Sequence, residues 1–138
     1  MTNVPFVDTS FIIAYAISTD DQHGKAELLE DIILSNNCYI NNNVLNECVT
    51  VSYNKTKNLE ISQEIYYILT DNFKILNEYN ILNYNSKTMD IFIKHNGKLS
   101  FTDAGIITTM LENNIGDLLT FDNQFKKESK INVIDKNL

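Results

Sequence analysis

The sequence contains no arginine and no tryptophan, only one proline, and only four glycines among its 138 residues. With so few turn-forming residues, a many-stranded β-sandwich, a collagen-like segment and a long disordered linker are excluded. The longest apolar runs, such as residues 11–17, fall far short of the roughly 20 residues that a transmembrane helix needs. The start of the sequence shows no basic segment followed by a cleavage site, so we expect no signal peptide, no membrane contact and a cytoplasmic location.

Residues that form disulfides or bind zinc are equally scarce. Cys38 and Cys48 are the only cysteines, and they do not form a Cys-x-x-Cys pair. Without a secretion signal, two reduced and buried thiols are expected rather than a disulfide. The two histidines, His23 and His95, match no zinc-binding pattern.

Acidic residues are in excess, with 18 Asp and Glu against 11 Lys and a formal net charge of −7. Nucleic-acid-binding domains usually carry a basic excess, so the overall charge argues against a generic nucleic-acid binder. A cluster of metal-binding carboxylates would account for part of the acidic excess. The location of the acids along the chain is therefore more informative than their number.

Short apolar runs alternate with segments of helical periodicity along the whole chain. Strands are predicted at residues 4–7, 38–40, 73–76, 118–121 and 131–134, and helices at 9–18, 20–33, 44–55, 61–69, 86–94 and 101–111. Strands that alternate with helices predict a parallel sheet covered on both faces. No internal repeat or domain boundary is evident, so one α/β domain over residues 1–138 is predicted.

Four acidic residues are predicted at one edge of this sheet. Asp8 follows the first strand and Asp122 follows the fourth, while Glu47 and Asp103 lie in the first turns of helices. Ligands of open parallel sheets bind outside the carboxyl ends of the strands. These four carboxylates are therefore expected to converge, although they are far apart in the sequence.

Each acid also has a structural explanation. Asp8 and Asp122 could cap helices, and Ser100 with Asp103 fits the capping-box pattern. Glu47 could be a solvated residue on a helix face. Together, however, like charges at short range destabilise a fold unless cations compensate them. The set therefore indicates Mg²⁺ or Mn²⁺, and with it phosphodiester hydrolysis in which water is the nucleophile.

The same residues resemble the motifs of the PIN domain nucleases, and particularly of the VapC-like toxins of prokaryotes. The matching segments are residues 6–10 (FVDTS), 44–47 (VLNE), 101–104 (FTDA) and 119–125 (LTFDNQF). Asp20, His23 and Ala26 also fit an acid, His and Ala spacing seen after the first helix of such toxins. The resemblance extends over nearly the whole chain, with the elements in the expected order.

The resemblance implies a PIN-like, three-layer α/β/α fold with a five-stranded parallel sheet. It implies that Asp8, Glu47, Asp103 and Asp122 are catalytic and surround Mg²⁺ (or Mn²⁺). The implied activity is endonucleolytic cleavage of RNA. The implied partners are a cognate antitoxin, as in a VapBC-type toxin–antitoxin pair, and a second copy in a homodimer.

Three further residues are expected to support the metal ligands. The resemblance implies that Thr9 and Thr120 orient the carboxylates through hydroxyl hydrogen bonds. Asn123 adjoins Asp122 and either contacts the substrate or metal-bound water or only caps the next turn.

The absence of arginine departs from the family pattern of basic residues around the cleft. The RNA backbone would instead meet lysine point charges, which lack bidentate geometry. The candidates are Lys55, Lys57, Lys87, Lys94, Lys98, Lys126, Lys127 and Lys130. Two alternatives stay open: a PIN-fold nuclease in RNA processing or DNA metabolism, and a catalytically silent module that binds RNA or protein.

Overall fold

The computed structural model describes residues 4–35 and 37–136. Its strands are Phe6–Val7 (β1), Tyr39–Asn41 (β2), Lys74–Leu76 (β3), Asp117–Leu119 (β4) and Asn132–Ile134 (β5). Its α-helices are Thr9–Ala16 (α1), His23–Leu28 (α2), Glu30–Ser35 (α3), Asn42–Thr56 (α4), Leu59–Asn72 (α5), Tyr84–Lys94 (α6) and Phe101–Glu112 (α7). Two 3₁₀ turns, Glu78–Asn80 (η1) and Asn123–Lys127 (η2), complete the described elements.

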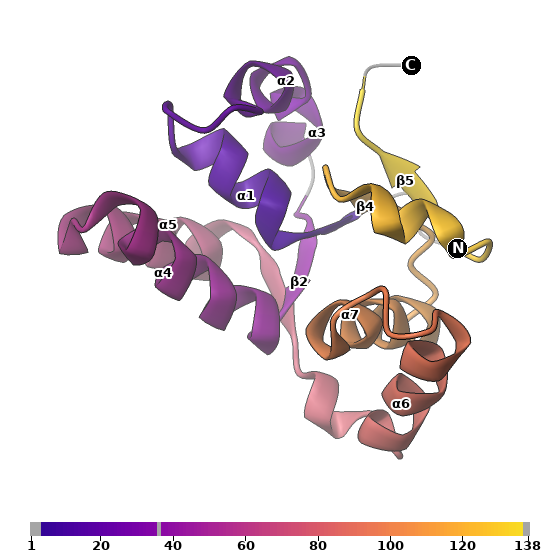
Figure 1. Cartoon of the computed structure of the whole chain (residues 1–138). Helices are drawn as coiled ribbons and strands as arrows, with labels where there is room; N and C mark the ends of the chain where they lie inside the picture. Colours follow the sequence, from indigo (N-terminus) through magenta and orange to yellow (C-terminus); the bar gives the residue numbers. More distant parts are fainter. Residues whose placement is uncertain (1–3, 36, 137–138) are drawn as a thin grey trace.

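The five strands form one parallel sheet in the order β3-β2-β1-β4-β5 (Figure 1). The chain moves from β1 outward to β3, then returns past β1 to β4 and β5. All carboxyl ends therefore lie at one edge, and the order reverses beside β1. Such a switch point is where open parallel sheets bind their ligands.

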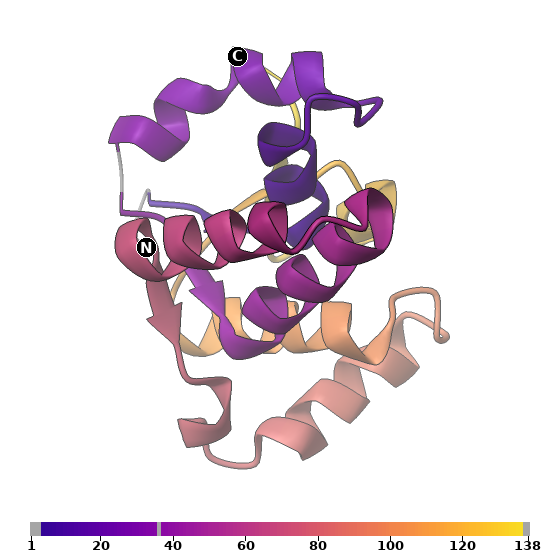
Figure 2. The ribbon, with the colours of Figure 1, turned by 90° about the vertical axis from the view of Figure 1, so that its left-hand side faces the viewer.

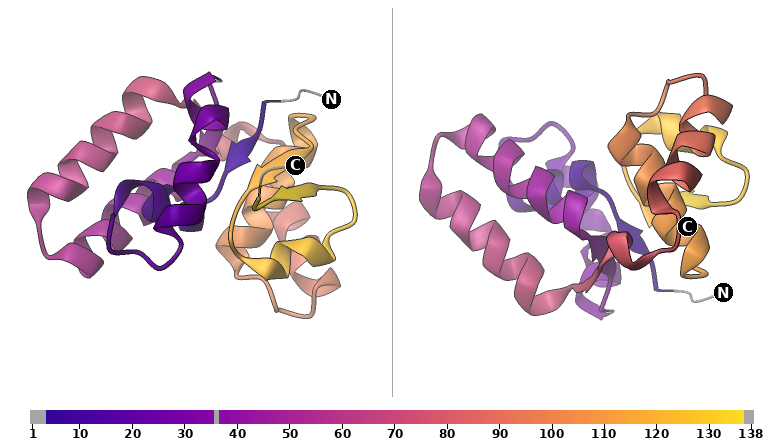
Figure 3. Two further views of the ribbon diagram at one scale, coloured as in Figure 1. Left: turned by 90° about the horizontal axis from the view of Figure 1, so that it is seen from above. Right: turned by 90° about the horizontal axis from the view of Figure 1, so that it is seen from below.

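Helices cover both faces of the sheet, which confirms the predicted three-layer α/β/α arrangement. Helices α1 to α5 lie on one side and α6 and α7 on the other (Figure 3). Figure 2 shows α4 and α5 side by side over the sheet, and the two helices pack closely. Helices α6 and α7 form a second packed pair.

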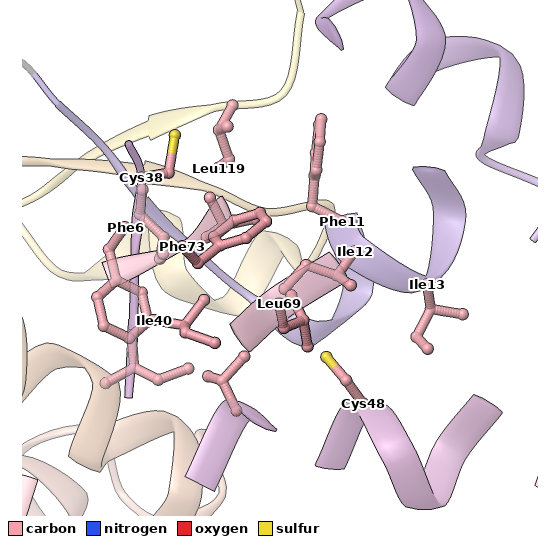
Figure 4. Close-up of a cluster of buried hydrophobic side chains, with 14 of the residues drawn as sticks. Phe6, Phe11, Ile12, Ile13, Cys38, Ile40, Cys48, Leu69, Phe73 and Leu119 are labelled. Carbon is pink, nitrogen blue, oxygen red and sulfur yellow. The ribbon is translucent and has the colours of Figure 1, made fainter. Parts of the chain in front are cut away.

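Buried apolar side chains of the strands form the centre of the core. Phe6, Ile40 and Leu119 are fully buried, as expected for strands covered on both faces. Figure 4 shows how they meet side chains from the neighbouring helices, among them Ile12 of α1 and Leu69 of α5. Residues of this kind hold the short strands in register, because a parallel sheet of two- and three-residue strands has few ladder hydrogen bonds.

The cysteines are both free and buried, as predicted. Cys38 precedes β2 and Cys48 lies on α4, where it faces the core (Figure 4). No helix in the described part of the chain is long and apolar enough to cross a membrane.

The structure corrects two predicted boundaries. The helix predicted over residues 20–33 is broken into α2 and α3 at the buried Leu29, whose N–H bonds back to the carbonyls of Ala26 and Glu27. The fourth strand ends at Leu119 rather than at residue 121. Thr120 and Phe121 therefore stand between the strand and Asp122.

Gly105 allows the close contact between α6 and α7. A Cβ atom at this position would overlap the hydroxyl of the buried Tyr84. Glycine is unfavourable inside a helix, so its presence here is explained by this approach.

We therefore expect Gly105→Ala to lower the free energy of unfolding by about 1–3 kcal/mol, because Tyr84 must move out of a packed site. Gly24→Ala is the matched control, since no atom lies within 4 Å of the added Cβ and alanine favours the helix by up to about 1 kcal/mol. Urea unfolding measures both values. Equal effects of the two substitutions would contradict the close packing of Tyr84 on α7.

Candidate metal and active site

Four carboxylates from four elements lie near the carboxyl edge of the sheet. Asp8 follows β1, and Asp122 occupies the N-cap position just before η2. Glu47 lies in the second turn of α4, and Asp103 lies in the first turn of α7. The pKa of Asp103 is raised to about 7, mainly by burial and then by the charges of Asp8, Asp122 and Glu47, in that order. The structure thus brings together the four acids that the sequence pattern singles out.

Two hydroxyl groups hold Asp8. Ser10 Oγ donates to Asp8 Oδ2 at 2.9 Å, and Thr120 Oγ1 donates to the same oxygen at 2.7 Å. Asp8 is only 4% exposed, and this burial raises its pKa, while the two hydroxyl bonds lower it in part. The nearby charge of Asp122 raises it as well. Asp8 is therefore a desolvated carboxylate with a fixed orientation.

The main chain after β4 fixes the two hydroxyls in turn. The N–H of Phe121 donates to Ser10 Oγ at 3.1 Å, and the N–H of Asp122 donates to Thr120 Oγ1 at 3.0 Å. Each hydroxyl accepts one of these bonds and directs its own proton to Asp8. The loop that positions Asp122 is thereby joined to the carboxylate of Asp8.

Glu47 and Asp122 are each held by one polar contact. Thr9 Oγ1 donates to Glu47 Oε1 at 2.8 Å, and burial raises the pKa of Glu47. Asp122 Oδ1 accepts the N–H of Gln124 at 2.9 Å and so caps η2. Asn123 is exposed at the start of η2.

These contacts bear on the capping alternatives for the acids. Asp8 occupies the N-cap position of α1, but its side chain makes no capping bond within that helix. Ser100 caps α7 by accepting the N–H of Asp103, and a hydrogen bond with the Ser100 side chain also lowers the pKa of the Asp103 carboxylate in part. Only Asp122 acts as a cap through its carboxylate.

Ser10 contacts the acids in addition to Thr9 and Thr120, the two residues from which we expect this orienting role. Thr9 donates a hydrogen bond to Glu47, whereas Ser10 and Thr120 both donate to Asp8. Sequence reasoning did not assign this contact to Ser10. Its position two residues after Asp8 is a signal, but the approach of its Oγ to Thr120 Oγ1, 3.1 Å away and 110 residues later in the chain, requires the folded structure.

The turn at the start of α4 is fixed from two sides. The side chain of the fully buried Asn41 accepts the N–H of Val44 and donates to Thr109 on α7. The buried carboxylate of Glu78 accepts the main-chain N–H groups of Asn42 and Asn43, the first two residues of α4. These bonds fix α4, which carries Glu47, relative to α7, which carries Asp103.

The charge of the four acids is not balanced by a lysine or histidine. Within residues 4–35 and 37–136, every ion pair lies elsewhere, for example between Lys94 and Glu128 or between Lys87 and Glu112. In the same residues, no three Asp, Glu, His or Cys side chains lie close enough together to hold a metal ion. The donor set is made only of carboxylates, and burial together with the charge of neighbouring acids raises the pKa values of Asp8, Glu47 and Asp103. Oxygen donors of this kind fit a hard divalent cation.

The chain belongs to the PIN domain family, since the family model for the PIN domain matches residues 6–130. No curated protein sequence matches the chain.

Several solved structures share the fold, among them the following three. VapC20 of Mycobacterium tuberculosis, described as a toxin that cleaves the sarcin–ricin loop, has a TM-score of 0.76, 23% identity, and coverage of 91% of this chain and 95% of its own. VapBC2 of Rickettsia felis, solved with a DNA fragment from its promoter, has a TM-score of 0.70, 17% identity, and coverage of 95% and 97%. PAE2754 of Pyrobaculum aerophilum has a TM-score of 0.65, 15% identity, and coverage of 94% and 89%.

The raised pKa of Asp103 predicts how stability depends on pH without metal. The folded pKa of about 7 exceeds the ordinary aspartate pKa of 3.8, so the folded chain binds more protons than the unfolded chain between these two values. The free energy of unfolding therefore falls as pH rises from about 4 to about 7, and it stays lowered above that.

Thermal unfolding in chelator-treated buffer measures this dependence. We expect Asp103→Asn to flatten the decline between pH 5 and pH 7.5 and to raise the melting temperature at the upper end. Asp117→Asn is the control, because Asp117 lies at the other end of β4, where it accepts a bond from Asn132. An unchanged slope in Asp103→Asn would contradict the crowding of the four charges.

Proposed function

We propose that this PIN domain protein is an endoribonuclease that depends on Mg²⁺ or Mn²⁺ and hydrolyses RNA phosphodiester bonds with water. The observation that carries the proposal is the set of four uncompensated carboxylates at the switch point of the sheet. Asp8, Glu47, Asp103 and Asp122 are the proposed catalytic and metal-binding residues. Residues 1–138 are proposed to form a single domain.

Three of these acids are held through one oxygen each, which supports their role as ligands. The oxygens are Oδ2 of Asp8, Oε1 of Glu47 and Oδ1 of Asp122. The second oxygen of each carboxylate is the one we assign to the cation. A bound cation would lower the pKa of water and stabilise the charge that develops on the phosphate oxygens.

The hydroxyl groups of Thr9, Ser10 and Thr120 keep these carboxylates oriented. Because each hydroxyl donates its proton to a carboxylate, it favours the ionised form that binds metal. Asn123, exposed next to Asp122, is proposed to contact the substrate or a metal-bound water.

We further propose that the protein is the toxin of a VapBC-type pair and acts in the cytoplasm. The likeness in fold to VapC20 and VapBC2 supports this assignment. The proposed protein partners are a cognate antitoxin and a second copy in a homodimer. Apolar side chains exposed on α3 and α5, including Leu34, Tyr66 and Ile68, support protein contacts of this kind.

Cleavage of total cellular RNA with and without Mg²⁺ or Mn²⁺ tests the activity. We expect discrete, metal-dependent fragments from the wild type. Loss of a residue that only supports a metal ligand reduces activity roughly 10–100-fold. Asp8→Asn removes a proposed ligand itself, so it should reduce cleavage by more than this. Its melting temperature without metal should be equal or higher, because asparagine retains an acceptor for Ser10 and Thr120 and carries no buried charge.

The other outcomes separate the alternatives. Cleavage of DNA but not RNA would indicate a PIN nuclease of DNA metabolism. Binding of RNA without cleavage under either metal would indicate a silent binding module. Full activity in Asp8→Asn would contradict the assignment of the site.

A further inference from the structure

A cleft of about 330 Å³ lies between α1 and α4, and two residues of its lining contact Asp8 and Glu47. Thr9, Ser10 and Ile13 of α1 form one wall, and Val51 and Lys55 of α4 form the other. Phe121, Asp20 and Gln22 complete the lining. A volume of this size is within the range of small-ligand sites.

The cleft is continuous with the acid cluster through three of its residues. Thr9 and Ser10 donate to Glu47 and Asp8, respectively, and Phe121 immediately precedes Asp122. A ligand in the cleft would therefore lie next to any group bound at the acids.

One stripe of α4 leads from the acids into the cleft. Glu47, Val51 and Lys55 are spaced four residues apart, so they lie on the same face of the helix. At 1.5 Å per residue, Lys55 is about 12 Å along the helix from Glu47. This is a distance that a short stretch of RNA backbone can span.

The lining combines the groups that a nucleotide requires. Ile13, Val51 and Phe121 provide an apolar wall, and the ring of Phe121 is fixed by stacking on the buried Phe11, with centroids 5.2 Å apart. Aromatic rings of this kind stack on the bases of single-stranded RNA. Lys55 is the cation of the lining.

Lys55 is held only weakly in the structure. Its Nζ atom lies 3.6 Å from Asp20 Oδ2, and its side chain is 50% exposed, whereas that of Asp20 is 14% exposed. The other oxygen of Asp20 accepts the N–H of Gln22, so Asp20 is fixed and Lys55 is the mobile partner of the pair. A phosphate group could take the place of Asp20.

From this geometry we infer that the cleft binds a nucleotide of the RNA strand adjacent to the bond that is cleaved. Its base packs on Phe121 and Val51, and its phosphate accepts a hydrogen bond from Lys55 Nζ, which leaves Asp20. This inference rests on the proposed ribonuclease function. Of the eight lysines that are candidates for contact with the RNA backbone, it selects Lys55.

A purely structural role for Lys55 makes a different prediction. In that case the pair with Asp20 would only join α4 to the loop after α1, and exposed pairs of this kind contribute little stability. Loss of Lys55 would then leave RNA affinity no more affected than loss of any other exposed lysine.

Binding of a fluorescent single-stranded oligoribonucleotide of about ten residues, measured by anisotropy with Ca²⁺ in place of Mg²⁺ to limit cleavage, distinguishes the two roles. We expect Lys55→Gln to weaken binding about fivefold or more and to reduce the slope of log affinity against log salt by about 0.7, the value for one lost phosphate contact. Lys74→Gln is the matched control, because it removes the same charge from an exposed lysine at the start of β3, at the edge of the sheet opposite the four acids. It should change neither quantity to this extent.

Asp20→Asn gives a prediction of the opposite sign. Asparagine retains the acceptor for the N–H of Gln22 but releases Lys55, so RNA binding should become tighter. In the double variant with Lys55→Gln this gain should be largely lost, because the gain acts through Lys55.

Equal affinities and salt slopes for Lys55→Gln and Lys74→Gln would overturn the nucleotide site, while cleavage of RNA by the wild type would leave the proposed function standing. If Lys55→Gln kept its RNA affinity but lost binding to a purified protein partner, the cleft would be a protein-binding groove and the inference would be wrong. A wild type that neither binds nor cleaves RNA with metal would overturn both the inference and the proposed function.

Discussion

Repulsion among four carboxylates is the interaction on which the arrangement of this molecule depends. Asp8, Glu47, Asp103 and Asp122 share one edge of the sheet, and each raised pKa there reflects burial together with neighbouring negative charge. Ions of the same sign at this range favour either protonation or a bound cation. The surrounding hydrogen bonds stabilise the ionised carboxylates, so the site is suited to a cation rather than to neutral acids.

The rest of the structure holds the charges in place against this repulsion. The hydroxyl groups of Ser10 and Thr120 join Asp8 to the loop after β4, and their own orientation comes from main-chain N–H groups. At the start of α4, Asn41 and Glu78 provide the corresponding anchor. Both sets of contacts lie at the carboxyl edge, which is where a parallel α/β sheet leaves its strand ends and helix starts unpaired.

The sequence predicts the order of elements well, because apolar runs that end at Asp8 or near Asp122 have few other interpretations in an α/β chain. It does not predict the break between α2 and α3, since Ala26, Leu29 and Ile32 have the same spacing in one helix or in two. Nor does periodicity reveal that the fourth strand ends at Leu119. Beyond Leu119, the N–H of Thr120 bonds to the carbonyl of Ile134, and its side chain bonds to Asp8 across the sheet.

The convergence of the acids was predictable for the same reason as the fold, because strand ends of a parallel sheet meet at one edge. The detailed contacts were not predictable. Which hydroxyl serves which carboxylate depends on atoms brought together from residues more than a hundred positions apart, as for Ser10 and Thr120. The cleft beside Lys55 likewise arises from the packing of α1 on α4 and has no signature in the sequence.

Calorimetric titration of the metal-free protein with Mn²⁺ and Mg²⁺ tests most directly whether the four acids form a cation site. We expect saturable metal binding to the wild type. The control Asp117→Asn, which removes an acid at the other end of β4, should bind in the same way. In Asp8→Asn and Asp122→Asn we expect the metal affinity to fall at least about tenfold. Binding that is absent from the wild type, or unchanged when Asp8 and Asp122 are replaced, would contradict the metal site.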